Sequence, residues 1–140
     1  MPSPVWNFQY SVQCNASRTA AWKYWADVAN WDDPPARFEL SGPFQVGSKL
    51  TTILPDQSWH SIITHVDPER EAVVEMQLVD AVLAFEWKFE DDVSNRSRIT
   101  QRLALTGPNA SAFVDQVRIF EMSVPQGMKR LARLIEQAVG

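Results

Sequence analysis

Polar and apolar side chains alternate along most of the chain before Asn109, and the pattern then changes. Between residues 36 and 106 the period is about two, which is typical of strands with one buried face. After Asn109 apolar residues recur every three or four positions, as on one face of a helix. The pattern predicts an antiparallel sheet followed by a long amphipathic helix. A curved sheet with a helix across its concave face encloses a space that can hold a ligand.

The N-terminal part predicts a strand, a short Trp-rich helix and three further strands. Residues 5–14 alternate weakly, and Ser17 then offers a side-chain oxygen to the free N–H groups of a helix that begins at Arg18. A second short helical turn is expected around Trp31, because the prolines that follow it end a helix. The next three strands are expected at residues 36–40, 48–54 and 58–66.

The last three strands are expected to be joined by short hairpin loops. A loop at Asp80–Ala81 places apolar residues opposite one another, as one buried face requires: Met76 with Phe85, Val74 with Trp87, and Ala72 with Phe89. A loop at residues 93–95 does the same for the next pair of strands: Phe89 with Ile99, Trp87 with Gln101, Phe85 with Leu103, and Leu83 with Leu105.

The opposite face of these strands carries charges that the same register brings together. Glu86 falls opposite Arg102 and Glu90 opposite Arg98, which supports the second loop. Glu75, however, falls opposite Glu86, and this like-charge contact counts against the first loop.

The C-terminal helix is expected to begin near Asn109. Pro125 and Gly127 interrupt it, so a kink is expected near Val124. One apolar stripe runs along its length and should face the sheet; its members are Phe113, Val117, Phe120, Val124, Met128, Leu131, Ile135 and Ala138.

Composition narrows the classes of protein. The 140 residues are expected to form one domain, residues 1–140. A net charge of −4 and a pI near 5.1 argue against a nucleic acid or an anionic membrane as the main partner. No apolar run approaches the roughly 20 residues of a membrane span. Cys14 is the only cysteine, and no signal-peptide pattern is seen, so the expected location is the cytoplasm.

Several segments together resemble the helix-grip superfamily, also called START-like or SRPBCC, in its polyketide cyclase/dehydrase branch. They are ASRTAAWKYWADVANWD, GPFQVGSKL, THVDPER, LALTGPNA and VPQGMKRLARLIEQA. The resemblance covers nearly the whole chain. It implies an α+β fold in which a seven-stranded curved antiparallel sheet wraps around a long C-terminal helix, with two short helices after the first strand. It also implies an apolar cavity. Members bind lipids, hormones or polyketides, and some act as cyclases or hydratases.

Gln101 is the polar residue of most interest, because the predicted register places it on the buried face opposite Trp87. A buried amide without a partner costs on the order of 1–3 kcal/mol, so it must find one. The partner is either an oxygen of a ligand, or a group of the protein itself such as Ser61 or Thr52, or a trapped water.

Other residues of the same face are expected to line the ligand space. They form either the walls of a pocket or simply the core, and in this fold both are compatible. The candidates for ligand binding are Trp59, Ser61, Met76, Phe85, Trp87, Gln101, Leu103 and Phe120.

His60 and His65 are the only histidines and the candidates for a catalytic base. Five residues apart on one strand, they point to opposite faces, so they cannot share a metal, and no metal site is predicted. The loop that follows decides which one faces inward. A four-residue loop places His65 inside, and a five-residue loop places His60 inside. An ordinary structural role for both is the alternative.

The sequence therefore predicts a protein that binds a small hydrophobic or amphipathic molecule between the sheet and the C-terminal helix, without a cofactor. The first alternative is an enzyme of the cyclase or dehydratase type, in which the same space shapes a reactive chain and a histidine moves a proton. The second is a protein-interaction module without a ligand, which predicts an exposed apolar patch. A homodimer is the usual symmetric assembly.

Overall fold

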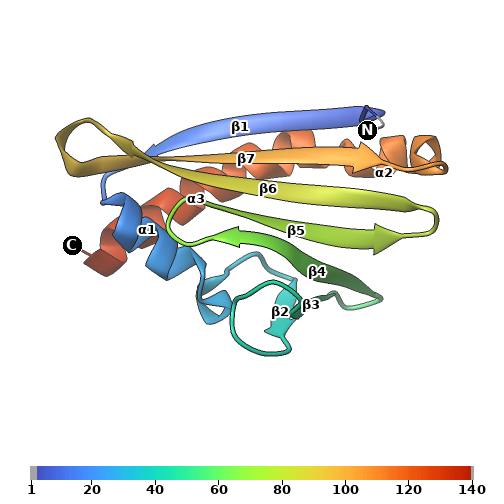
Figure 1. Cartoon of the computed structure of the whole chain (residues 1–140), viewed down its shortest axis with the longest axis horizontal. Coiled ribbons are helices and arrows are strands. Elements are labelled where there is room, and N and C mark those ends of the chain that lie inside the picture. The colour runs from blue at the N-terminus through green and yellow to red at the C-terminus, as the bar shows by residue number, and fades with distance from the viewer. Residues whose placement is uncertain (1–2, 140) are drawn as a thin grey trace.

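The computed structural model describes residues 3–139 and contains one antiparallel sheet with helices on its concave side (Figure 1). The strands lie in the order β1-β7-β6-β5-β4-β3-β2. Their bounds are β1 Trp6–Cys14, β2 Arg37–Leu40, β3 Lys49–Ile53, β4 Ser58–Asp67, β5 Glu71–Leu78, β6 Ala81–Asp92 and β7 Arg96–Thr106. The helical segments are α1 Arg18–Trp25, η1 Val28–Asn30, η2 Val93–Asn95, η3 Ala110–Phe113, α2 Val114–Val117 and α3 Phe120–Val139. The seven expected strands are confirmed.

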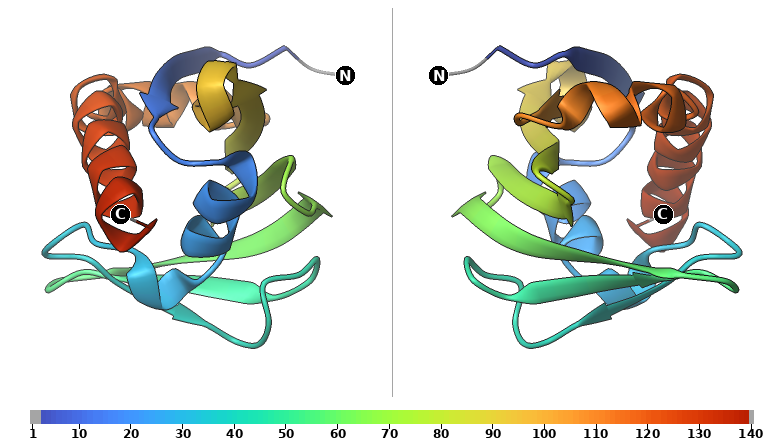
Figure 2. Two further views of the ribbon diagram at one scale, coloured as in Figure 1. Left: turned by 90° about the vertical axis from the view of Figure 1, so that its left-hand side faces the viewer. Right: turned by 90° about the vertical axis from the view of Figure 1, so that its right-hand side faces the viewer.

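The sheet curves into an arc, and α3 lies across the open side of that arc (Figure 2). α3 runs beside β1, and a polar contact fixes each half of it. Near its start, Nε1 of Trp6 donates to Oε2 of Glu121 at 2.9 Å. Near its end, the backbone N–H of Asn15 donates to Oε2 of Glu136 at 2.8 Å. The helix-grip arrangement is therefore confirmed, with α3 packed chiefly along the β1 edge.

An aromatic cluster fills the space where α1 meets the sheet. Ser17 caps α1, because its Oγ accepts from the N–H of Ala20 at 3.1 Å. The buried face of α1 carries Trp25, which is only 2% exposed and lies 4.9 Å from Trp87 between ring centroids. The rings of the cluster are those of Trp22, Trp25, Trp31, Phe44, Trp87 and Phe89.

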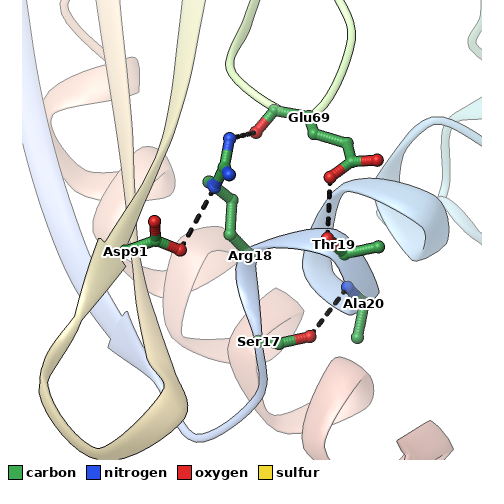
Figure 3. A network of polar contacts seen from close by, with 6 residues as sticks. All are labelled: Ser17, Arg18, Thr19, Ala20, Glu69 and Asp91. Atoms are coloured by element: carbon green, nitrogen blue, oxygen red, sulfur yellow. Dashed lines mark hydrogen bonds and ion pairs between the residues drawn. The ribbon is translucent and has the colours of Figure 1, made fainter.

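Polar contacts hold the start of α1 against β6 and the turn between β4 and β5 (Figure 3). Nε of Arg18 lies 3.2 Å from Oδ1 of Asp91 in β6, and its Nη1 donates to the backbone oxygen of Glu69 at 3.1 Å. Oγ1 of Thr19 donates to Oε1 of Glu69 at 2.7 Å. Glu69 lies in the turn between β4 and β5, so α1 is fixed to the turn and to β6 at once.

The register between β6 and β7 is the predicted one. Trp87 pairs with Gln101, and Glu86 pairs with Arg102, whose Nη1 donates to Oε2 of the glutamate at 2.8 Å. The register between β5 and β6 was predicted wrongly by two residues.

In the structure Leu78 pairs with Ala81, so the loop is Val79–Asp80, and Met76 faces Leu83 instead of Phe85. Asp80 takes a left-handed conformation with φ 55°, which an aspartate tolerates better than most residues. The conflict between Glu75 and Glu86 disappears, since Glu75 pairs with Ala84.

The C-terminal helix is interrupted earlier than predicted. α2 ends at Val117, and α3 begins at Phe120 and continues through Pro125. The break before Phe120 is an interruption that the sequence did not predict, and the kink near Val124 stays a prediction.

Candidate functional site

Gln101 lies in the middle of the concave face, between Tyr10 on β1 and Trp87 on β6. Its neighbours on the same face of β7, Ile99 and Leu103, are fully buried. Gln101 itself is 8% exposed, and none of the side-chain hydrogen bonds among residues 3–139 involves its amide. The amide still reaches accessible space, because Oγ of Ser97 is the one side-chain polar atom in this range that is both sealed and unpartnered.

The side chains that continue this face toward the start of α3 are only half-buried. Phe85 meets Phe120 edge-on, with 5.7 Å between ring centroids, and this contact joins the sheet to α3. Met76 lies one strand further along and is also half-buried. These residues form a partly accessible apolar surface where the sheet meets the start of α3, and we call this surface the α3 groove. Leu103, fully buried, is part of its floor.

Of the remaining ligand-binding candidates, Trp87 and Ser61 lie at the margins of the α3 groove and Trp59 lies outside it. Trp87 packs on Trp25 and so belongs to the aromatic cluster as much as to the groove. Ser61 is 2% exposed and pairs with Met76. Trp59 is half-buried beside Thr52 and packs against neither of the two clusters of buried residues, so it lies apart from Gln101.

The spacious cavity implied by the family resemblance is not among the hollows found in the described residues. One open hollow of about 430 Å³ lies beside η1 and β2, and another of about 210 Å³ lies over the outer face of the sheet around His65 and Arg102. The aromatic cluster explains why the implied cavity is not found there, because its rings occupy the end of the space under α1.

The prediction that one histidine faces the concave side was wrong. Ser61 and Ile63 point inward, and a β-bulge between Ile63 and His65 then turns the strand, so Val66 packs inward instead. His65 points outward, where its Nε2 lies 3.0 Å from Oε1 of Glu71. His60 alternates with the inward residues and is exposed. Neither imidazole reaches the α3 groove.

Tyr10 is the residue that sequence reasoning missed. It is half-buried, belongs to the inward-facing set of β1 and pairs with Gln101 in the sheet. Its phenol therefore comes from the strand next to the amide of interest. The alternation of Trp6, Phe8 and Tyr10 in the first strand contains the signal that would have found it.

Cys14 is the buried thiol at the far end of β1. Its Sγ lies 3.8 Å from the backbone oxygen of Ala132 in α3. Burial, assisted by the charge of Glu136, raises the pKa of the Cys14 thiol from 9.0 to about 11. A thiol that stays protonated at neutral pH is a poor nucleophile, so Cys14 acts as a packing residue.

A charged contact spans the rim between α3 and the loop before β2. Nη1 of Arg130 donates to the backbone oxygen of Asp32 at 3.0 Å. Desolvation raises the pKa of the neighbouring Asp33 carboxyl group, and the positive charge of Arg130 opposes that shift. Elsewhere in residues 3–139, no three histidine, cysteine or carboxylate side chains gather as metal ligands. None of the helices described is both long and apolar enough to cross a membrane.

Comparisons with known proteins place the fold. No protein-family model matches the sequence, and no curated protein matches it. Solved structures do match. Norcoclaurine synthase from Thalictrum flavum, in complex with dopamine and hydroxybenzaldehyde, has a TM-score of 0.73 and 15% identity over 96% of this chain and 89% of that chain. A protein from Arthrobacter aurescens has a TM-score of 0.70 and 18% identity, over 94% and 86% of the two chains.

The di-domain ARO/CYC protein BexL, from the BE-7585A biosynthetic pathway, is also similar. Its TM-score is 0.73 at 14% identity, over 94% of this chain and 47% of that chain. These likenesses define the class of structure: the chain has the helix-grip fold that norcoclaurine synthase and a two-domain ARO/CYC protein also have.

Proposed function

We propose that this protein binds a small, uncharged and largely apolar molecule in the α3 groove, with the amide of Gln101 hydrogen-bonded to an oxygen of that molecule. The observation that carries the proposal is Gln101, which is 8% exposed as a whole residue and whose amide is bonded to no described side chain. An apolar ligand that covered the amide without bonding to it would incur a cost of about 1–3 kcal/mol, and a ligand oxygen avoids that cost.

The surroundings of Gln101 favour an uncharged ligand. Its sheet neighbours across the strands are Tyr10 and Trp87, and the next inward residues along β7 are Ile99 and Leu103. No lysine, arginine or carboxylate belongs to this set, so a charged ligand group loses its hydration without gaining a counter-ion. The half-buried Phe85, Met76 and Phe120 supply apolar surface for the rest of the molecule.

The similar structures support a small aromatic or polyketide-like ligand. One was solved with dopamine and hydroxybenzaldehyde, and another is named as an ARO/CYC protein of a biosynthetic pathway. They also favour the cyclase-type enzyme as the second candidate. In this chain that reaction would have to proceed without a histidine in the groove, since both imidazoles are outside it. Tyr10 is the titratable side chain that accompanies Gln101.

A dye titration tests the proposal. Nile red is uncharged, planar and largely apolar, and it carries a carbonyl oxygen that can accept from an amide. We expect wild-type protein to bind it and Gln101→Leu to bind it about tenfold more weakly, because one buried hydrogen bond is lost. Gln77→Leu is the matched control, since Gln77 is exposed on the outer face of β5.

Equal affinities of the wild type and Gln101→Leu would contradict the role of the amide. Absence of dye binding in all three proteins would favour the protein-interaction module instead.

A further inference from the structure

The hollow of about 430 Å³ beside η1 lies apart from the α3 groove. It opens between η1 and the segment that contains β2 and the start of the β2–β3 connection. Its lining residues are Ala26, Asp27, Val28, Ala29, Phe38, Leu40, Gly42, Pro43 and Phe44. The aromatic cluster separates it from Gln101, since Phe38 and Phe44 line the hollow and also contact Trp31 and Trp25.

The aromatic wall of this hollow is held in place from behind. The ring of Phe38 meets that of Trp31 edge-on at 5.2 Å, and the ring of Phe44 meets that of Trp25 at 5.1 Å. The turn that carries Phe44 is fixed as well, because Oγ of Ser48 donates to the backbone oxygen of Pro43 at 2.7 Å. A wall whose rings are already ordered loses little conformational entropy when a ligand packs on it.

Asp27 is the one charged residue among those that line the hollow. Its Oδ1 accepts from the backbone N–H of Ala29 at 3.1 Å and so caps η1. Within residues 3–139 it forms no ion pair with a lysine, arginine or histidine. The carboxylate is thus fixed by one oxygen and keeps the other oxygen for a donor from outside.

From these observations we propose that the hollow beside η1 binds a small organic amine, with the ammonium group on the Asp27 carboxylate and an apolar body against Phe38 and Phe44. Asp27, the single acidic residue of the lining, selects a cation, and the apolar remainder of the lining selects a hydrocarbon or aromatic body. This site is separate from the α3 groove, and this proposal does not depend on the ligand proposed for that groove.

Calorimetric titration with 2-naphthylmethylamine tests this site, with 2-naphthylmethanol as the uncharged match. We expect the wild type to bind the amine about five- to tenfold more tightly than the alcohol, and added salt to reduce that ratio. Asp27→Asn should abolish the preference and leave alcohol binding unchanged. It keeps the side-chain oxygen that caps η1, so the fold is preserved. Asp32→Asn is the matched control, because Asp32 does not line the hollow.

A further control separates this site from the α3 groove. Gln101→Leu should leave amine binding unchanged, so a failure in the α3 groove does not count against this proposal. Equal binding of amine and alcohol by the wild type, an unchanged preference in Asp27→Asn, or no measurable binding of either compound would overturn it.

Discussion

The two ends of the concave face use the same sheet in different ways. Under α1, Trp25 and Phe89 are each 2% exposed and belong to a continuous group of stacked and edge-on rings. Toward the start of α3, Phe85 and Met76 are only half-buried, and an unbonded amide lies beside them. The comparison indicates that the α1 end supplies stability while the α3 end retains accessible surface. One end of the curved sheet thus stabilises the fold, and the other end keeps apolar surface accessible.

The largest expected effect comes from removing the centre of the packed end. Trp25→Ala should lower the free energy of unfolding by about 3–5 kcal/mol, because a fully buried aromatic side chain leaves a cavity that its neighbours only partly fill. Met76→Ala, at the open end, should cost clearly less. Urea denaturation followed by circular dichroism measures both losses. Equal losses would show that the two ends are packed alike.

The next effect concerns the thiol at the junction of β1 and α3. Because the pKa of Cys14 is about 11 in the folded protein and 9.0 in the reference state, the unfolded chain releases the proton first as pH rises. The contribution of the protonated thiol to stability is therefore complete below pH 9 and lost toward pH 11. At about 1.4 kcal/mol per unit, the loss amounts to about 2–3 kcal/mol.

The difference in unfolding free energy between the wild type and Cys14→Ala isolates the contribution of the protonated thiol, because the other titrating groups are common to both proteins. A difference that stays constant from pH 8 to pH 11 would mean that Cys14 is accessible to water.

The sequence predicts a strand register only where a slipped register would change which side chains are buried. A one-residue slip between β6 and β7 would turn every side chain to the other face and separate Glu86 from Arg102, so that register was predictable. A two-residue slip keeps each side chain on its face. The β5–β6 loop was therefore misplaced. The contact between Glu75 and Glu86 and the left-handed conformation of Asp80 are the features that distinguish the two loops.

The bulge in β4 escaped prediction for a related reason. Alternation shows which residues face inward on each side of it, but it does not locate the extra residue. Because the two histidines stand on either side of that point, their orientation depended on it. The hollow beside η1 was equally hidden, since it depends on how Phe38 and Phe44 pack against distant tryptophans.

The smallest effect is expected from the outer face. His60→Ala and His65→Ala should each change the free energy of unfolding by less than about 1 kcal/mol, because exposed pairs such as the one between His65 and Glu71 contribute little. Nile red affinity should not change in either variant. A marked loss of dye binding in one of them would place an imidazole in the α3 groove after all.

The role of Gln101 can be observed directly by nuclear magnetic resonance. The side-chain NH₂ signals of Gln101 are those that disappear from the ¹⁵N–¹H spectrum of Gln101→Leu. During titration with acetophenone, a soluble neutral ketone, we predict that these signals shift saturably while those of the outer-face Gln77 stay in place. Saturable binding of the ketone that leaves the Gln101 signals unmoved would contradict the assignment of this amide as the ligand anchor.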